Sequence, residues 1–179
     1  MKQLAGKTVA LIATDFVEEP ELVKPRDQLR EAGATVLVYS PEGEPIQAAE
    51  GDVNPTRKID VDGSLGDVDV SAIDALVVPG GTVNADHLRM DGDAQKLVQQ
   101  AAEQGKTLAS ICHGPWLLVS AGVVGGRRLT SWPSLGDDIR NAGGEWVDEE
   151  VVVDGDLITS RKPDDIPAFV DAIQQALAG

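Results

Sequence analysis

The feature that most constrains the fold is a repeated alternation between short runs of branched apolar residues and longer segments with helical spacing. Such alternation is typical of a parallel β-sheet covered by helices on both faces. Two of the intervening segments, Glu21–Ala32 and Asp91–Glu103, stop at the glycines that commonly end helices, so we expect a helix over each. The runs that predict strands are TVALIA (8–13), TVLVY (35–39), ALVVP (75–79) and TLASI (107–111).

The rest of the chain adds smaller elements to this pattern. Residues 44–70 are acidic and contain Gly and Pro, so we expect a loop with a small hairpin at KIDVD. Asp154 and Gly155 lie between two apolar runs and predict a second hairpin. A helix over Asp164–Leu177 is expected to close the chain. With 179 residues, 42% of them hydrophobic, the length suits a single domain over 1–179.

The composition excludes several classes of partner. Fifteen Lys and Arg against thirty Asp and Glu give a net charge of −15, which disfavours nucleic acid and anionic membranes as partners. One cysteine cannot form an internal disulfide, and with two histidines it does not supply a structural zinc site, so we expect no metal and no cofactor. The start of the chain shows neither a cleavage site nor a membrane-spanning segment, which predicts a cytoplasmic protein.

The single cysteine, Cys112, is followed directly by His113 in the segment ASICHGPWLLVSAG. Pro115 suits a first helical turn and the next residues are apolar until Gly122, so the cysteine is expected at a strand-to-helix corner. Open parallel sheets bind ligands at this edge, and a helix N-terminus lowers the pKa of a thiol. We interpret Cys112 as a nucleophile; the alternative is a small buried apolar side chain beside a loop histidine.

Two further segments are expected at the same edge of the sheet. Glu18 or Glu19 follows the first strand, either as part of the site or as an acidic residue favoured in a first helical turn. Gly80 and Gly81 follow the third strand and either point N–H groups at an oxyanion or form a tight turn. Three further residues are not expected to take part in catalysis. We expect His87 at the surface or an interface, Trp116 in the core, and Ser131 in a structural role.

Together, the segments DFVEEPEL, DALVVPGG and ASICHGPWLLVSAGVVGGRRLTSWPS resemble the ThiJ/PfpI superfamily, specifically its PfpI-like intracellular protease and glyoxalase III branch. The resemblance covers almost the whole chain. It implies an α/β, flavodoxin-like three-layer sandwich, related to class I glutamine amidotransferase domains. In this fold a mostly parallel sheet has helices on both faces and a strand-to-helix nucleophile elbow.

The resemblance also implies how the thiol is activated. Cys112 is the elbow nucleophile and Glu18 hydrogen-bonds its sulfur. An ionised carboxylate beside a thiolate would oppose it, so the pair should share one proton, with Glu18 as the neutral donor. His113 is then the base or proton carrier.

The remaining site residues come from the glycine turns and from a second subunit. The resemblance implies that the N–H groups of Gly81 and His113 are oxyanion donors. Read from the residues alone, Gly80 belongs to the glycine pair at the oxyanion and Gly114 leaves room for close backbone approach. In PfpI-like proteins a carboxylate from a neighbouring subunit orients the histidine, and Asp86 matches that position best, which implies a homo-oligomer. Asp86 is one methylene shorter than the Glu of the archaeal proteases and its loop is one residue longer, which argues against proteolysis.

The implied activity is cysteine-dependent, cofactor-free turnover of reactive carbonyls such as methylglyoxal or their adducts, as in glyoxalase III or deglycase enzymes of stress responses. One alternative is an intracellular cysteine peptidase that attacks a peptide carbonyl. The other is a non-enzymatic redox sensor or protective protein in which Cys112 is oxidised.

Overall fold

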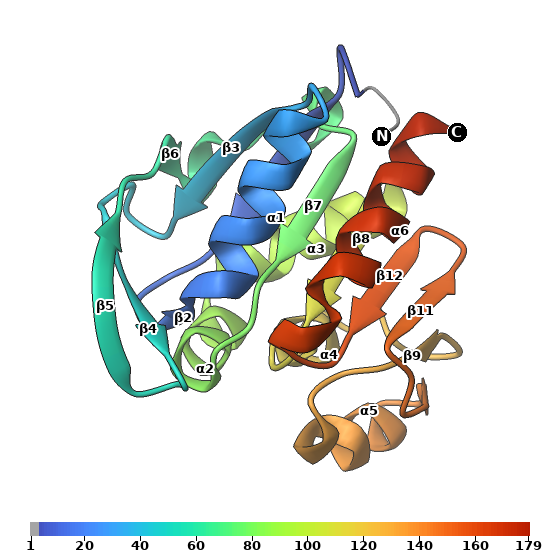
Figure 1. Cartoon of the computed structure of the whole chain (residues 1–179). Helices are drawn as coiled ribbons and strands as arrows, with labels where there is room; N and C mark the ends of the chain where they lie inside the picture. Colours follow the sequence, from blue (N-terminus) through green and yellow to red (C-terminus); the bar gives the residue numbers. More distant parts are fainter. Residues whose placement is uncertain (1–3) are drawn as a thin grey trace.

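The structure, a computed structural model, describes residues 4–179 and is built around a central sheet (Figure 1). Its strands are β1 (Thr8–Ile12), β3 (Thr35–Ser40), β6 (Gly63–Ser64), β7 (Ala75–Val78), β8 (Thr107–Ile111), β11 (Val151–Asp154) and β12 (Leu157–Ser160). Within the described residues they form seven strands in the order β11-β12-β8-β7-β1-β3-β6. All neighbours are parallel except β11 and β12.

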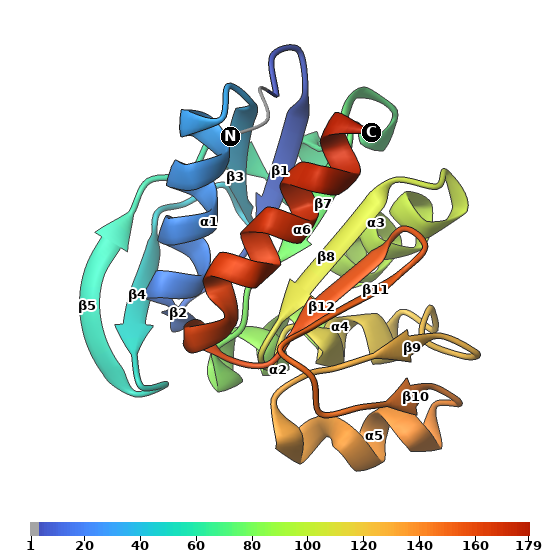
Figure 2. The same cartoon turned by 45° about the vertical axis from the view of Figure 1, so that its right-hand side comes forward.

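Helices cover both faces of this sheet. The view in Figure 2 shows α1 and α6 side by side on one face, with α3 and α4 behind the sheet on the other. α2 contacts both α3 and α4, and α5 contacts α4. The helices are α1 (Glu19–Glu31), α2 (Thr82–Met90), α3 (Gly92–Glu103), α4 (Pro115–Ser120), α5 (Gly136–Asn141) and α6 (Ile166–Ala178).

The central strands are buried on both faces, which explains their unbroken apolar sequences. In β1, Val9 and Leu11 pack into the core beneath α1 and α6, whereas Ala10 and Ile12 pack into the core on the α3 face. Neighbouring strand residues point to opposite faces, so a strand covered on both sides needs apolar residues throughout. The expected α/β three-layer, flavodoxin-like sandwich is confirmed.

Short elements extend this framework. A second sheet contains β2 (Val17–Glu18), β4 (Ile46–Glu50) and β5 (Asn54–Ile59), and β9 (Arg128–Leu129) pairs with β10 (Glu145–Trp146). Four 3-10 turns span Leu65–Asp67, Val70–Ala72, Pro133–Leu135 and Pro163–Asp165.

The expected hairpin within 44–70 exists, but its expected position at KIDVD is wrong. Its strands are β4 and β5, which are antiparallel, and only Lys58 and Ile59 of that motif belong to it. The end of the motif instead follows the sheet edge, where the Asp62 N–H donates to Val38 O and the Asp62 carboxylate accepts the Val38 N–H. Alternating apolar and polar residues indicate which side chains share a face of a strand. They do not indicate which neighbouring strand forms backbone hydrogen bonds with it.

The other expected elements are confirmed with small shifts of their ends. α1 begins at Glu19, before the expected Glu21, and α6 begins at Ile166 after a 3-10 turn. β11 and β12 form the predicted hairpin around Gly155. No helix formed by residues 4–179 has the length and apolar character to cross a bilayer.

The strand order defines where a ligand can bind. The chain passes from β1 outward to β3, then returns to the other side of β1 through β7 and β8. Sheets of this kind bind ligands outside the carboxyl ends of the strands where this reversal occurs, here between β1 and β7. At that edge lie α2 and the start of α4 (Figure 2).

We predict that Phe169→Ala destabilises the fold strongly because Phe169 of α6 is fully buried in the core on the α1 side. Loss of a buried phenyl ring costs about 3–5 kcal/mol of unfolding free energy. The matched control is Val153→Ala on edge strand β11, where the side chain is 58% exposed, with an expected change below about 0.5 kcal/mol. Urea unfolding measures both, and similar losses for the two variants would contradict this description of the core.

Candidate active site

Cys112 occupies a sharp turn directly after β8. Its φ of 61° lies in the left-handed region, which costs a residue with a side chain roughly 1–2 kcal/mol. Two backbone hydrogen bonds hold it there: the Cys112 N–H donates to Ser160 O at 3.0 Å, and the Trp132 N–H donates to Cys112 O at 2.8 Å. The expected strand-to-helix corner is therefore present, with Pro115 in the first turn of α4.

Two glycines allow the elbow to pack tightly on its neighbour, β7. A Cβ on Gly80 would lie 2.7 Å from Cys112 Cβ, and a Cβ on Gly114 would lie 2.5 Å from Val78 O and collide with Ser110 Oγ. Real Cβ atoms do not approach so closely. The close backbone approach expected at Gly114 is thus made to β7, inside the protein.

The structure places Glu21, and not Glu18, against the thiol. Glu21 is fully buried, its Oε2 accepts the Gly80 N–H at 2.8 Å, and the carboxyl interacts with the Cys112 side chain. Glu18 instead accepts the backbone N–H groups of Gly51 and Asp52 at 3.0 and 3.1 Å. The expected contact between Glu18 and the sulfur is wrong, although Glu18 lines the same cavity.

The reason is the geometry of α1. Glu18 precedes the helix, whereas Glu21 lies in its first turn and shares a buried face with Pro25 and Leu29 at intervals of four residues. This face points at the sheet. The sequence signal that could have identified Glu21 is its position in the apolar stripe of α1.

Burial governs the protonation of the pair. Removal from water raises the pKa of Glu21 well above its ordinary value, so the neutral acid is favoured, and the Gly80 hydrogen bond only partly opposes this. Burial also raises the pKa of the Cys112 thiol, and the charge and hydrogen bonding of an ionised Glu21 would raise it further, while the N–H groups of Gly81 and His113 lower it. The expected net lowering of the thiol pKa by a helix terminus is therefore wrong, because desolvation of the thiol outweighs the effect of the two N–H groups.

His113 connects the thiol to α2. Its Nδ1 lies 3.3 Å from Cys112 Sγ and its Nε2 lies 3.3 Å from Thr82 Oγ1. Burial lowers the pKa of the imidazole, and the negative charge of Asp52 opposes that shift. The ring stacks on Trp132 at 5.8 Å between centroids, with Trp116 edge-on at 5.4 Å.

The backbone N–H groups of Gly81 and His113 act on the Cys112 side chain and lower the pKa of its thiol. Their expected role as oxyanion donors stays a prediction. Gly81 adopts a φ of 91°, and the fully buried Asn84 fixes its turn: Asn84 Nδ2 donates to Gly80 O and its Oδ1 accepts the Thr14 N–H. Sequence reasoning missed Asn84, whose amide ties the ends of β1 and β7 together.

A cavity of about 190 Å³ opens above the thiol. Larger hollows elsewhere on the described surface, of about 340 and 510 Å³, contain neither cysteine nor histidine. The residues lining the smaller cavity are Glu18, Glu21, Gly51, Asp52, Cys112, His113, Trp132 and Pro163.

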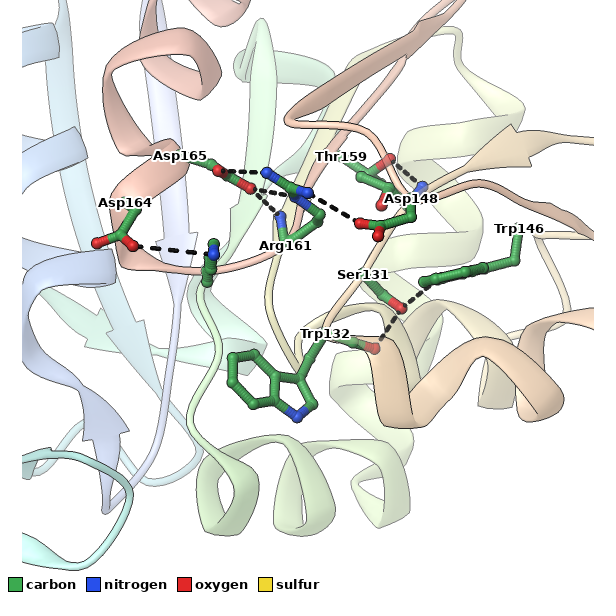
Figure 3. A network of polar contacts seen from close by, with 10 residues as sticks. Ser131, Trp132, Trp146, Asp148, Thr159, Arg161, Asp164 and Asp165 are labelled. Carbon is green, nitrogen blue, oxygen red and sulfur yellow. Dashed lines mark hydrogen bonds and ion pairs between the residues drawn. The ribbon is translucent and has the colours of Figure 1, made fainter.

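A polar network lies in the segments that carry Trp132 and Pro163, two of the residues that line the cavity (Figure 3). Ser131 Oγ accepts the Trp146 indole N–H and donates to Trp132 O, which supports its expected structural role. Arg161 bridges the buried Asp165 and Asp148, just before Pro163 in the chain. The figure shows the Trp132 ring projecting away from these ion pairs.

Three expectations concerned residues around the site. Asp86 and His87 are exposed on α2, and within residues 4–179 Asp86 is not brought to His113. Trp116 is half-buried, not fully within the core, because its indole N–H donates to Asp138 while its ring packs on His113.

A cysteine at a strand-to-helix elbow, with an adjacent histidine and a buried carboxyl at the carboxyl edge of a flavodoxin-like sheet, defines a class of α/β proteins. The DJ-1/PfpI family model matches residues 7–176, and the chain belongs to this family. It is 40% identical to "Protein/nucleic acid deglycase 2" of Escherichia coli over 92% of this chain and 94% of that protein. It is 39% identical to "Deglycase PfpI" of Pyrococcus furiosus, covering 92% and 95%. The crystal structure of Drosophila melanogaster DJ-1beta superposes with a TM-score of 0.87 at 34% identity, covering 97% and 91%.

We predict that Glu21 makes stability depend on pH. Its folded-state pKa is raised, so its contribution is fully present below the unfolded value of about 4.3 and is lost as pH rises toward the folded value. Over that window the wild type should lose up to about 1.4 kcal/mol per pH unit relative to Glu21→Gln. Urea unfolding of both proteins across this range measures the difference, and a constant difference would show that Glu21 is ionised in the folded state.

Proposed function

We propose that the chain is a cysteine-dependent enzyme of the PfpI type that acts on reactive carbonyls, with Cys112 as nucleophile. The observation that carries the proposal is the elbow itself: a strained Cys112 whose sulfur meets His113 Nδ1 at 3.3 Å and the backbone N–H groups of Gly81 and His113. Relatives named as deglycases support the same activity.

Activation of the thiol begins with the neutral Glu21. Its Oε2 accepts the Gly80 N–H, and its Oε1 has no hydrogen-bond partner among the described residues. We infer that the neutral Glu21 carboxyl, which interacts with the Cys112 side chain, donates its proton as a hydrogen bond to Sγ and so stabilises a thiolate. His113 takes the thiol proton at Nδ1, because this is the nitrogen that faces the sulfur.

The thiolate then adds to the aldehyde carbon of a 2-oxoaldehyde such as methylglyoxal and forms a hemithioacetal. The N–H groups of Gly81 and His113 stabilise the developing oxyanion. The oxyanion takes the proton held by His113, which frees His113 to act as a base. His113 then moves the proton of the former aldehyde carbon to the carbon of the neighbouring carbonyl through an enediol, while the hydroxyl proton goes to that carbonyl's oxygen, which gives a thioester of lactate. Water releases lactate and restores the thiol, so the reaction needs no external oxidant.

The size of the cavity favours a small substrate. Its volume of about 190 Å³ lies below the range of roughly 300–1,000 Å³ typical of pockets for larger ligands. It accommodates a small carbonyl compound or the modified end of one side chain more readily than several residues of an extended peptide. We therefore favour aldehydes and their adducts over general proteolysis.

We predict that Cys112→Ala folds normally and forms no lactate from methylglyoxal in the absence of glutathione. The covalent step has no substitute within the cavity, since Cys112 is the only cysteine in the sequence. Circular dichroism checks folding and an enzymatic lactate assay checks turnover. Retained turnover would remove Cys112 from the mechanism, whereas a stable oxidised cysteine in an inactive wild type would indicate a redox sensor.

We also propose that Asp86 reaches His113 of a neighbouring subunit in a homo-oligomer. Asp86 is exposed on α2, so it is available to another chain. Within one chain the ring nitrogens of His113 already face Cys112 Sγ and Thr82 Oγ1, so the carboxylate from the other chain would act through its charge and favour the charged imidazole.

The test mixes two inactive proteins, Cys112→Ala and Asp86→Asn, under conditions in which subunits exchange. Some mixed sites would combine an intact Cys112 from one chain with an intact Asp86 from the other, so we predict partial recovery of turnover. Exchange is checked independently with labelled chains. Proven exchange without recovery would rule out a shared site.

A further inference from the structure

We propose that Asp52, in the turn between β4 and β5, is a positioning residue that holds His113 through Thr82 within the same chain. The inference rests on the proposed function, because it assigns His113 the role of proton carrier. It adds a carboxylate from the turn between β4 and β5, which sequence analysis did not connect with the site.

Asp52 reaches α2 by a direct contact. Its Oδ1 accepts the Thr82 N–H at 2.8 Å, across 30 residues of sequence. Figure 1 shows the turn between β4 and β5 beside the start of α2. Asp52 lines the same cavity as His113, and its backbone N–H is held by the Glu18 carboxylate at 3.1 Å.

This contact completes the start of α2. The helix has Gly81 as its N-cap, so its own cap residue has no side chain to accept a free N–H group. The Asp52 carboxylate, from the turn between β4 and β5, supplies that acceptor. Its negative charge also interacts favourably with the positive end of the helix dipole. Thr82 thereby acquires a defined place, with its Oγ1 3.3 Å from His113 Nε2.

The hairpin turn sets the backbone of Asp52. Its φ of 68° lies in the left-handed region, as does the φ of 63° at Gly51 before it. Hairpin turns use this region, and aspartate adopts it more readily than most residues. In this turn Asp52 is joined to Glu18 through its backbone N–H and to Thr82 through its carboxylate.

Charge supports the same assignment. The titratable groups facing His113 from the packed elements are Cys112 on the elbow, Glu18 and Glu21 at the start of α1, and Asp52 on the hairpin. Among them Asp52 is the group whose charge raises the pKa of His113 against the effect of burial. A charged imidazole would donate from Nδ1 to the thiolate and from Nε2 to Thr82 Oγ1.

The test is the titration of His113 by imidazole NMR in Asp52→Asn and Asp52→Ala. The chain has two histidines, so exposed His87 provides an internal reference in each spectrum. Asparagine keeps an acceptor for the Thr82 N–H and removes the charge; alanine removes both. We expect the His113 midpoint to move to lower pH in both variants with His87 unmoved, because loss of a negative neighbour destabilises the imidazolium.

Turnover gives a second readout. We expect Asp52→Ala to lower turnover roughly tenfold or more, as is typical when a group that orients a reactive side chain is lost. Thr82→Val should resemble Asp52→Ala, whereas Thr82→Ser, which keeps a hydroxyl, should restore most of the activity. The matched control is Asp91→Asn, because Asp91 caps the start of α3 through the N–H groups of Asp93 and Ala94.

Three results would overturn the proposal: an unmoved His113 midpoint in Asp52→Asn, unchanged turnover in Asp52→Ala, or equal effects in Asp91→Asn. Recovery of activity on mixing Cys112→Ala with Asp52→Asn chains would also contradict it, since Asp52 should act within the chain that holds the intact Cys112. The NMR titration needs no substrate. If the proposed carbonyl chemistry is wrong, the titration therefore still tests whether Asp52 acts on His113.

Discussion

The left-handed turn at Cys112 is the constraint on which the rest of the site depends. It directs the sulfur out of β8 toward the carboxyl edge of the sheet, and it is retained because Ser160 O and the Trp132 N–H bind the backbone on either side. Each partner comes from a different part of the second half of the fold. These contacts offset the strain of the left-handed Cys112 backbone. Hydrogen bonds of Ser131 and Arg161 in turn hold the two segments that contact the elbow.

Three carboxylates line the cavity above the thiol, those of Glu18, Glu21 and Asp52. No Lys or Arg is among the described residues that line it. Each carboxylate is instead held by backbone N–H groups: Glu18 by the hairpin turn, Glu21 by Gly80, and Asp52 by the start of α2. Backbone dipoles orient these groups without supplying a full positive charge.

Burial then separates the roles of these similar side chains. Glu21 is fully enclosed and favours its neutral form, which suits a hydrogen-bond donor to sulfur. Asp52 is half-exposed at the rim, where its charge acts on His113. Two carboxylates within one cavity can therefore support a thiolate and an imidazolium, the two charges that transfer of the thiol proton creates.

The sequence by itself determined the layered fold, because a strand buried on both faces must be apolar throughout, and it determined the place of Cys112, His113, Gly80 and Gly81 at the ends of particular strands. It did not determine which acid meets the sulfur: Glu18 and Glu21 differ by less than one helical turn, and the exact start of α1 decides which one faces the sheet. Nor did it connect Asp52 with Thr82, since a turn carries no periodic signal and its partner is 30 residues away. Periodicity records which face of an element is buried, whereas contacts between loops depend on how separate elements meet in space, and only the tertiary structure decided those.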